Sequence, residues 1–359
     1  MGVENKWHFN LQRRYRTGKL NKITDVPGVK VGHLTLQQGD DNTGVTAIIP
    51  APGNLFKQKL LAGDKVLNGF GKTAGLVQVD ELGTLETPIL MTNTFAVGTC
   101  LNALIDYSLK DNPDIGLTTG TVNPVVMECN DGDLNDIRAR HVTEANALSA
   151  LAAAQTADPN FAEGGVGAGT GMTCMGFKGG IGSASRTVEI AGKTYHLGCL
   201  LNSNFGFFGN LRAGDFLIGE ALRNAVLDRA KQEHNPKYTR YLPDKDKGSV
   251  VMVIATDAPL SSRQLRRLST RTSMGLARTG SYSGDGSGDI AVAFSTANRI
   301  DHNAQSAYQV EVLPDSLLDD LFQATVETVE ESVLSSLVHA KTTTGIRDNT
   351  FYSLADFLQ

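Results

Sequence analysis

The chain has 359 residues, of which 41% are hydrophobic, 20% charged and 6% aromatic, a composition that excludes a disordered chain and allows a sizeable core. Lysine and arginine number 33 and aspartate and glutamate 38, so the net charge of −5 lacks the basic excess typical of nucleic-acid binding. Glycine is unusually frequent, with 38 residues, which indicates many positions where the backbone must be bare.

The cysteines and the N-terminal segment bear on the cellular compartment. The four cysteines form no CxxC or Cys/His cluster, and we expect them to be reduced core residues: Cys100, Cys129, Cys174 and Cys199. The first twenty residues contain no apolar run of the length that a signal peptide needs, and no stretch approaches the roughly 20 apolar residues that span a bilayer. We therefore expect a cytoplasmic protein without a metal or cofactor.

Strand and helix patterns alternate in the first half of the chain. Turn residues and a buried β run predict a strand, a turn and a second strand over residues 23–50. Apolar spacing predicts a helix that Thr94 caps and that continues to Tyr107, and a second helix from Thr143 to about Ala157. The polar loop Glu128–Arg140 lies between them.

Residues 164–182 contain nine glycines in nineteen positions. The segment does not fit the dinucleotide motif GxGxxG, and Phe177 occupies the place where a phosphate-binding loop requires lysine. These mismatches argue against a nucleotide site. We expect closely packed backbone or a pocket wall instead.

A sharp change of composition follows the hairpin predicted over Arg186–Asn204 with its turn at Ala191-Gly192. From Asp228 to Gly248, ten of 21 residues are charged and two prolines interrupt the segment, which predicts an exposed, non-helical linker. The run Val250–Ala255 follows directly and is typical of a strand buried on both faces.

The remaining elements are a helix over Ser262–Leu276, a loop over Ser281–Asp289, a strand over Ile290–Phe294 and a helix over Pro314–Val338. Strands and helices are mixed without the regular alternation of a doubly wound sheet. The pattern therefore predicts an α+β protein with helices layered on a mostly antiparallel sheet.

Familiar hydrolase motifs are missing. Asp285 and Asp289 stand where the GxSxG elbow would need glycines around Ser287, and there is no HExxH. The junction Gly248-Ser249 offers another source of chemistry, because a serine hydroxyl can attack the preceding carbonyl and glycine tolerates the strained backbone. Cleavage there would give Ser249 a free α-amine, whose ordinary pKa of roughly 7.7–8.0 suits a general base.

Four passages, in order along the chain, resemble the self-processing aminopeptidases that include the L-aminopeptidase D-amidase/D-esterase and the β-aminopeptidases. They are ITDVPGVKVGH (Ile23–His33), NPVVMECNDGDLNDIRARHV (Asn123–Val142), GAGTGMTCMGFKGGIGSASR (Gly167–Arg186) and the long passage Gly248–Asn298, which begins GSVVMVIATDAP and contains SGDGSGD. The resemblance implies a four-layer αββα sandwich, similar to N-terminal nucleophile hydrolases but with different strand connectivity. It also implies a cut at Gly248-Ser249 into chains 1–248 and 249–359, which stay together in one folded domain, and a homotetramer of cleaved heterodimers.

The resemblance assigns the catalytic residues. It implies Ser249 as nucleophile, Ser287 as second catalytic serine, Asp289 as acidic partner and Asn204 as the amide that stabilises the oxyanion. Without the family context, Ser287 and Asp289 would be interpreted as a surface turn, and Asn202 competes with Asn204.

The resemblance also assigns the substrate side. It places Glu128 in a loop that faces the substrate's free amino group, for which a carboxylate is a suitable partner. Asp133 stands where some relatives have an aromatic residue in the pocket.

The expected function is hydrolysis of N-terminal aminoacyl peptides, amides or esters through an acyl-enzyme on Ser249. The alternative is an acyltransferase like the ornithine acetyltransferases, which share the fold but use threonine, so the serine favours a hydrolase. A non-enzymatic binding protein that retains the sandwich is a third possibility. Pocket shape rather than motif decides between L-, D- and β-aminoacyl substrates.

Overall fold

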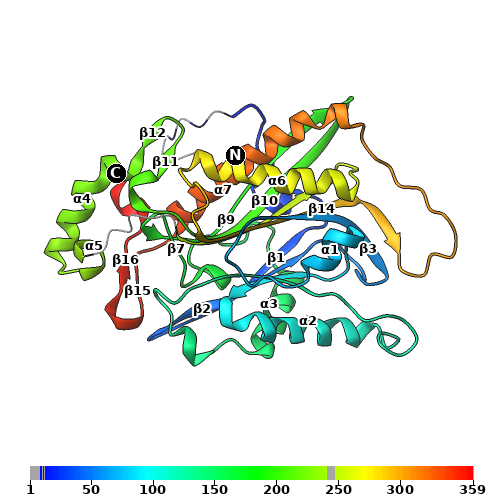
Figure 1. The fold of residues 1–359 in the computed structure, drawn as a ribbon, viewed down its shortest axis with the longest axis horizontal. Helices are drawn as coiled ribbons and strands as arrows, with labels where there is room; N and C mark the ends of the chain where they lie inside the picture. The colour runs from blue at the N-terminus through cyan, green and yellow to red at the C-terminus, as the bar shows by residue number, and fades with distance from the viewer. Residues whose placement is uncertain (1–8, 10, 12, 241–246, 359) are drawn as a thin grey trace.

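Two β-sheets face each other at the centre of the molecule (Figure 1). The computed structural model describes residues 9, 11, 13–240 and 247–358. The larger sheet contains, in spatial order, β4 (Thr84–Leu85), β3 (Gln58–Gly69), β14 (Gly286–Asp301), β13 (Lys247–Thr256), β10 (Lys193–Asn204) and β9 (Gly180–Ile190). The smaller sheet contains β1 (Lys30–Gln38), β2 (Asp41–Ile49), β5 (Ile89–Asn93) and β6 (Val125–Cys129).

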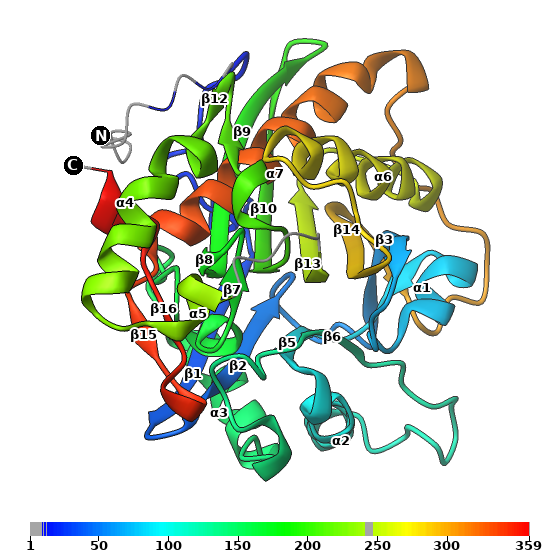
Figure 2. The same ribbon diagram turned by 60° about the vertical axis from the view of Figure 1, so that its left-hand side comes forward.

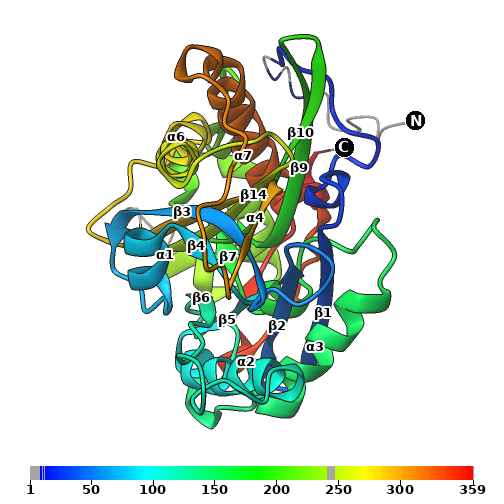
Figure 3. The same cartoon turned by 90° about the vertical axis from the view of Figure 1, so that its right-hand side faces the viewer.

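Helices cover the outer face of each sheet (Figure 3). The helices α6 (Ser262–Arg278) and α7 (Asp319–His339) pack on the larger sheet, and α2 (Val97–Asp111) and α3 (Glu144–Thr156) pack on the smaller one. Three hydrophobic clusters fill the spaces between these four layers. The expected αββα sandwich is therefore confirmed, with an α+β mixture of parallel and antiparallel pairs.

Shorter elements complete the fold at its periphery. The helices are α1 (Leu76–Leu82), α4 (Ile218–Gln232) and α5 (Pro236–Arg240). The two-stranded pairs are β7 (Thr173–Cys174) with β8 (Phe177–Lys178), β11 (Arg212–Ala213) with β12 (Phe216–Leu217), and β15 (Thr343–Thr344) with β16 (Thr350–Phe351). No helix within the described part of the chain is long and apolar enough to cross a membrane.

Strand β13 lies in the interior of the larger sheet, between β10 and β14. All residues of the run Val250–Ala255 are buried, as the unbroken apolar sequence predicts. Val251 and Val253 face the core between the sheets, whereas Val250 and Met252 face the helices. Because both faces and both edges of this strand are covered, its first residues are held in fixed register with their neighbours.

The glycine-rich segment is closely packed backbone, as expected. At Gly182, for example, an added Cβ would lie 1.9 Å from the carbonyl oxygen of Ser332 in α7. A bare position there lets the last helix approach β9 closely. The four cysteines are free and buried, also as expected.

Two helical predictions need correction. Asn93, not Thr94, accepts the backbone N–H groups of Phe95 and Ala96 at the start of the helix, because its side chain reaches both from the end of β5. The charged linker is not wholly exposed and non-helical. It contains α5, which Pro236 begins, since proline is tolerated in the first turn of a helix.

The linker and the last helix differ from the sequence prediction in two further respects. Tyr238 of α5 is buried and donates a hydrogen bond to the carbonyl of Gly176, which ties this part of the linker to the core. The last long helix begins at Asp319, because the turn after Pro314 is a separate 3-10 helix over Asp315–Leu317. Residues 241–246 of the linker lie outside the described residues.

Candidate active site

The strand ends of both sheets border a cavity of about 460 Å³. Strand β6 of the smaller sheet packs against β13 and β10 of the larger one, and Figure 2 shows the start of β13 next to this junction. Glu128, Asn204, Gly248 and Ser249 line the cavity together with Asp133. Segments that are 44 to 121 positions apart in the sequence thus meet at one site, which the sequence resemblance predicted without showing their geometry.

Ser249 lies near the start of β13. It stands opposite Asn204 of β10 on one side and Gly288 of β14 on the other. The serine is 3% exposed, and its hydroxyl oxygen has no hydrogen-bond partner among the described residues. Gly248 has φ +119°, and an added Cβ would lie 1.9 Å from the carbonyl oxygen of Asn204. Only glycine fits at this position, directly before a buried and unpaired hydroxyl.

Ser287 and Asp289 lie on β14, directly beside the Gly248-Ser249 peptide. In the parallel pair, Gly248 stands opposite Ser287 and Val250 opposite Asp289. Both polar side chains are fully buried, and the Ser287 hydroxyl donates a hydrogen bond of 2.6 Å to Asp289 Oδ1. The predicted loop over Ser281–Asp289 is therefore wrong at its end, because β14 begins at Gly286, where β13 provides a partner strand.

Asn204 faces the cavity from the end of β10. Its Oδ1 accepts the backbone N–H of Thr173 at 3.0 Å, and its Nδ2 donates to the carbonyl of Asn130 at 2.9 Å. These two contacts fix which end of the amide is the donor. Asn202 lies deeper in β10, is fully buried and does not line the cavity, so the geometry favours Asn204 over it.

Glu128 presents a carboxylate from the end of β6. It is 3% exposed, accepts the backbone N–H of Lys72 at 2.8 Å on Oε1, and accepts the hydroxyl of Thr94 on Oε2. Thr94 is free for this contact because Asn93 caps the helix. No positively charged side chain forms an ion pair with Glu128 among the described residues, so the carboxylate can receive an ammonium group.

The outer wall of the cavity carries further charges. Asp133 forms an ion pair of 2.8 Å with Lys237, and its side chain is half exposed. The ammonium group of Lys72 lies 4.5 Å from the centre of the Phe70 ring, on the opposite wall. Sequence reasoning missed Lys72 and Phe70, which belong to no motif, and gave Thr94 a capping role.

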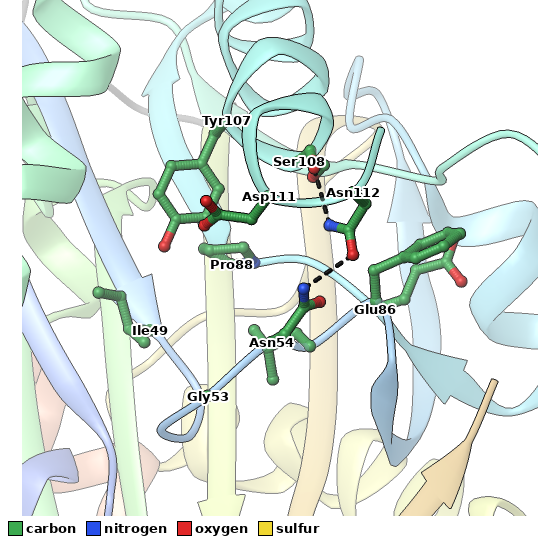
Figure 4. A pocket seen from close by; sticks show the side chains of 11 residues that line it. Ile49, Gly53, Asn54, Glu86, Pro88, Tyr107, Ser108, Asp111 and Asn112 are labelled. Carbon is green, nitrogen blue, oxygen red and sulfur yellow. Dashed lines mark hydrogen bonds between the residues drawn. The ribbon is translucent and has the colours of Figure 1, made fainter. Parts of the chain in front are cut away.

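A second cavity, of about 40 Å³, lies beneath the C-terminal end of α2 (Figure 4). Its polar groups satisfy one another, because Asn54 donates to Asn112 at 2.7 Å and Asn112 donates to the Ser108 carbonyl at 2.7 Å. None of the predicted site residues lines it. Across residues 13–240 and 247–358 there is also no group of three or more His, Cys, Asp or Glu side chains that could hold a metal ion.

Comparisons with known proteins identify the family of the chain. Peptidase family S58 matches residues 21–351. The β-peptidyl aminopeptidase BapA of Sphingosinicella microcystinivorans is 38% identical over 352 residues, which cover 94% of this chain and 86% of that protein. A β-aminopeptidase from a Burkholderia species is similar in structure, with a TM-score of 0.84 and 38% identity over 98% of this chain and 97% of the other.

A third relative defines the fold. The L-aminopeptidase D-Ala-esterase/amidase of Ochrobactrum anthropi has a TM-score of 0.84 and 33% identity over 96% of this chain and 94% of its own. It is described as a prototype for the serine aminopeptidases and as a new variant among the Ntn hydrolase fold. The predicted family, fold and hydrolase activity are therefore confirmed. The chain belongs to peptidase family S58 and is an aminopeptidase with amidase and esterase relatives.

Proposed function

We propose that the chain cleaves itself between Gly248 and Ser249 and that the new N-terminal serine carries the peptidase reaction. The working enzyme then consists of chains 1–248 and 249–359, which remain one folded domain. Two observations support the cut: the left-handed backbone of Gly248, and the buried, unpaired hydroxyl of the residue that follows it. In the cut, the hydroxyl attacks the Gly248 carbonyl, the acyl group moves from nitrogen to oxygen, and water then releases it.

The new α-amine of Ser249 serves as the general base. It takes the hydroxyl proton as the oxygen attacks the substrate carbonyl, and gives that proton to the departing amine. Water then hydrolyses the acyl-enzyme. Ser287 and Asp289, which are hydrogen-bonded at 2.6 Å beside this terminus, orient the amine and its protons.

Asn204 stabilises the negative charge that develops on the carbonyl oxygen. Its Nδ2 carries two protons, of which the Asn130 carbonyl takes one, so the second can serve the oxyanion. It stands directly opposite Ser249 in the antiparallel pair, on the wall of the same cavity. A side-chain donor of this kind stabilises a transition state by about 3–4 kcal/mol.

Glu128 binds the free ammonium group of the substrate and so restricts cleavage to the N-terminal residue. The observation that carries this function is that the recognition carboxylate, the oxyanion amide and the nucleophile all line one cavity. We propose short peptides, aminoacyl amides and esters as substrates. β-Aminoacyl groups are included, because two relatives are named for β-peptides.

The assembly and compartment are also proposals. We propose a homotetramer of cleaved heterodimers, as the family resemblance implies. The buried free cysteines are compatible with the reducing cytoplasm.

Denaturing electrophoresis of freshly purified protein tests the mechanism. We expect two fragments of 248 and 111 residues for the natural protein, and one intact, inactive chain for Ser249→Ala. The matched control is Ser295→Ala, which changes a buried serine further along β14 and should be processed normally. An active Ser249→Ala variant, or full activity of the natural protein as a single uncut chain, would overturn the proposal.

A further inference from the structure

Lys178, in the glycine-rich segment, is a fully buried lysine that does not line the active-site cavity. Its ammonium group donates to three backbone carbonyls, of Gly169 and Met172 at 2.9 Å and of Gly179 at 2.8 Å. All three of its protons are therefore used. No carboxylate lies within ion-pair distance of it among the described residues. Burial of a cation without an ion-pair partner is costly, and the three carbonyls are the groups that compensate it here.

One of these carbonyls connects Lys178 to the proposed oxyanion donor. The carbonyl of Met172 and the N–H of Thr173 belong to the same peptide group. That N–H donates to Asn204 Oδ1 at 3.0 Å, and Asn204 Nδ2 faces the cavity. The ammonium group is thus separated from the catalytic amide by a single peptide unit.

The electrostatic effect of this arrangement has a definite sign. A cation at the Met172 carbonyl polarises the peptide group and makes the Thr173 N–H a stronger donor. A stronger bond to Oδ1 in turn draws electrons from Nδ2 and increases the positive charge on its protons. The same bond fixes the amide orientation, since a flipped Asn204 would set an NH2 group against the Thr173 N–H.

We propose that Lys178 is a positioning residue that orients and polarises the Asn204 amide through the peptide group between Met172 and Thr173. The proposal rests on the proposed role of Asn204. It gives the glycine-rich segment a function in catalysis, because the three carbonyls that surround the ammonium group come from backbone that only a glycine-rich sequence can fold so closely.

Burial opposes the charge on Lys178, and only the protonated lysine can donate to all three carbonyls. Burial lowers the pKa of Lys178 to about 7, while attraction to the Asp131 carboxylate raises it. Asp131 follows Asn130, whose carbonyl is the other partner of the Asn204 amide. Burial also raises the pKa of Asp131 to about 6, so the amide is held between two turns that each contain a buried titratable group.

A double-mutant cycle tests the coupling. We expect Lys178→Met, which removes the charge at similar length, to lower kcat about 10-fold and to leave KM within about 2-fold, since Glu128 is untouched. In an Asn204→Ala background the same substitution should have no further effect on kcat. Activities are expressed per cleaved molecule, and where a variant is cut slowly, the rate at which the 111-residue chain appears is compared as well.

A second variant avoids the buried substitution, in case Lys178→Met does not fold. Replacing Thr173 by its α-hydroxy acid turns the N–H into an ester oxygen, which deletes the bond to Asn204 and weakens the Met172 carbonyl as an acceptor for Lys178. We expect a similar fall in kcat. The matched control is the same replacement at Thr118, whose N–H donates to the Asp114 carbonyl in an exposed loop, and it should leave kcat unchanged.

The outcomes separate the two proposals. If Asn204→Ala keeps full kcat, the oxyanion assignment itself is wrong. If Asn204→Ala lowers kcat but the Lys178→Met effect is absent, or is equally large in the Asn204→Ala background, then only the role of Lys178 is overturned. An unchanged kcat for the Thr173 ester also overturns it.

Discussion

The two sheets make different contributions to the active site. The larger sheet supplies the groups proposed for bond making, on the adjacent strands β10, β13 and β14. The smaller sheet and its connections supply Glu128, Thr94 and Asp133, which line the side of the cavity proposed to receive the substrate. The groups proposed for reaction and those proposed for recognition therefore lie on different layers of one sandwich.

The difference has a physical basis. The start of β13 is paired on both edges, so Ser249 and its neighbours are fixed in register, which suits reaction geometry that must hold within fractions of an ångström. Glu128 ends a strand, and the residues that follow it belong to a loop over 130–137 that lines the cavity. Loops tolerate substitution, so recognition can vary while the chemistry stays fixed.

The largest effect should come from the bond-making side. We expect Ser287→Ala to lower kcat about 10²- to 10⁴-fold, because the amine of Ser249 loses a partner in its proton network. KM should change little, since Glu128 remains in place. Steady-state kinetics on an aminoacyl p-nitroanilide measures both values. A rise in KM with an unchanged kcat would contradict the proposal that the larger sheet carries the reaction and the smaller sheet carries substrate recognition.

The next effect should appear on the recognition side. We expect Glu128→Gln to raise KM about 10- to 100-fold with kcat within a few-fold, because a charge-assisted bond to the substrate ammonium is lost. N-acetylated substrates lack the ammonium group and should be equally poor for both proteins. A loss confined to kcat would instead give Glu128 a part in the chemistry.

Thr94 sharpens the comparison, because it lines the cavity and its hydroxyl donates to Glu128. We expect Thr94→Val to raise KM about 2- to 10-fold, since it removes one neutral hydrogen bond to the carboxylate. Thr92→Val is the control. Thr92 stands opposite Glu128 in the parallel pair but donates to the Gly44 carbonyl, so its loss should leave KM unchanged. Equal effects of both variants would indicate general loosening of β5.

The smallest effect is expected at Asp133, on the outer wall of the cavity. Asp133→Asn breaks the partly exposed ion pair with Lys237, and such pairs contribute about 0–1 kcal/mol. We expect the melting temperature of the variant to stay within a few degrees of that of the natural protein. The ratio of KM for a lysyl amide to KM for an alanyl amide should rise about 2-fold. Differential scanning fluorimetry and paired KM measurements check this. A large fall in kcat would instead give Asp133 a part in the reaction.

Local sequence determined much of this protein. The unbroken apolar run Val250–Ala255 specifies a strand buried on both faces, and Ala191-Gly192 specifies a tight hairpin turn, in which both residues have positive φ. The Gly248-Ser249 junction and the order of the family motifs pointed to the nucleophile and to the hydrolase class. These features depend on residues that are close together in the chain.

Only the tertiary structure decided the rest. SGD looks like a surface turn until β13 pairs with it and buries Ser287 and Asp289. Thr94 looks like a helix cap until Asn93 takes that role and leaves its hydroxyl to Glu128. In each case a partner distant in sequence outweighs the local preference, because a buried polar group must find a hydrogen bond wherever the fold provides one.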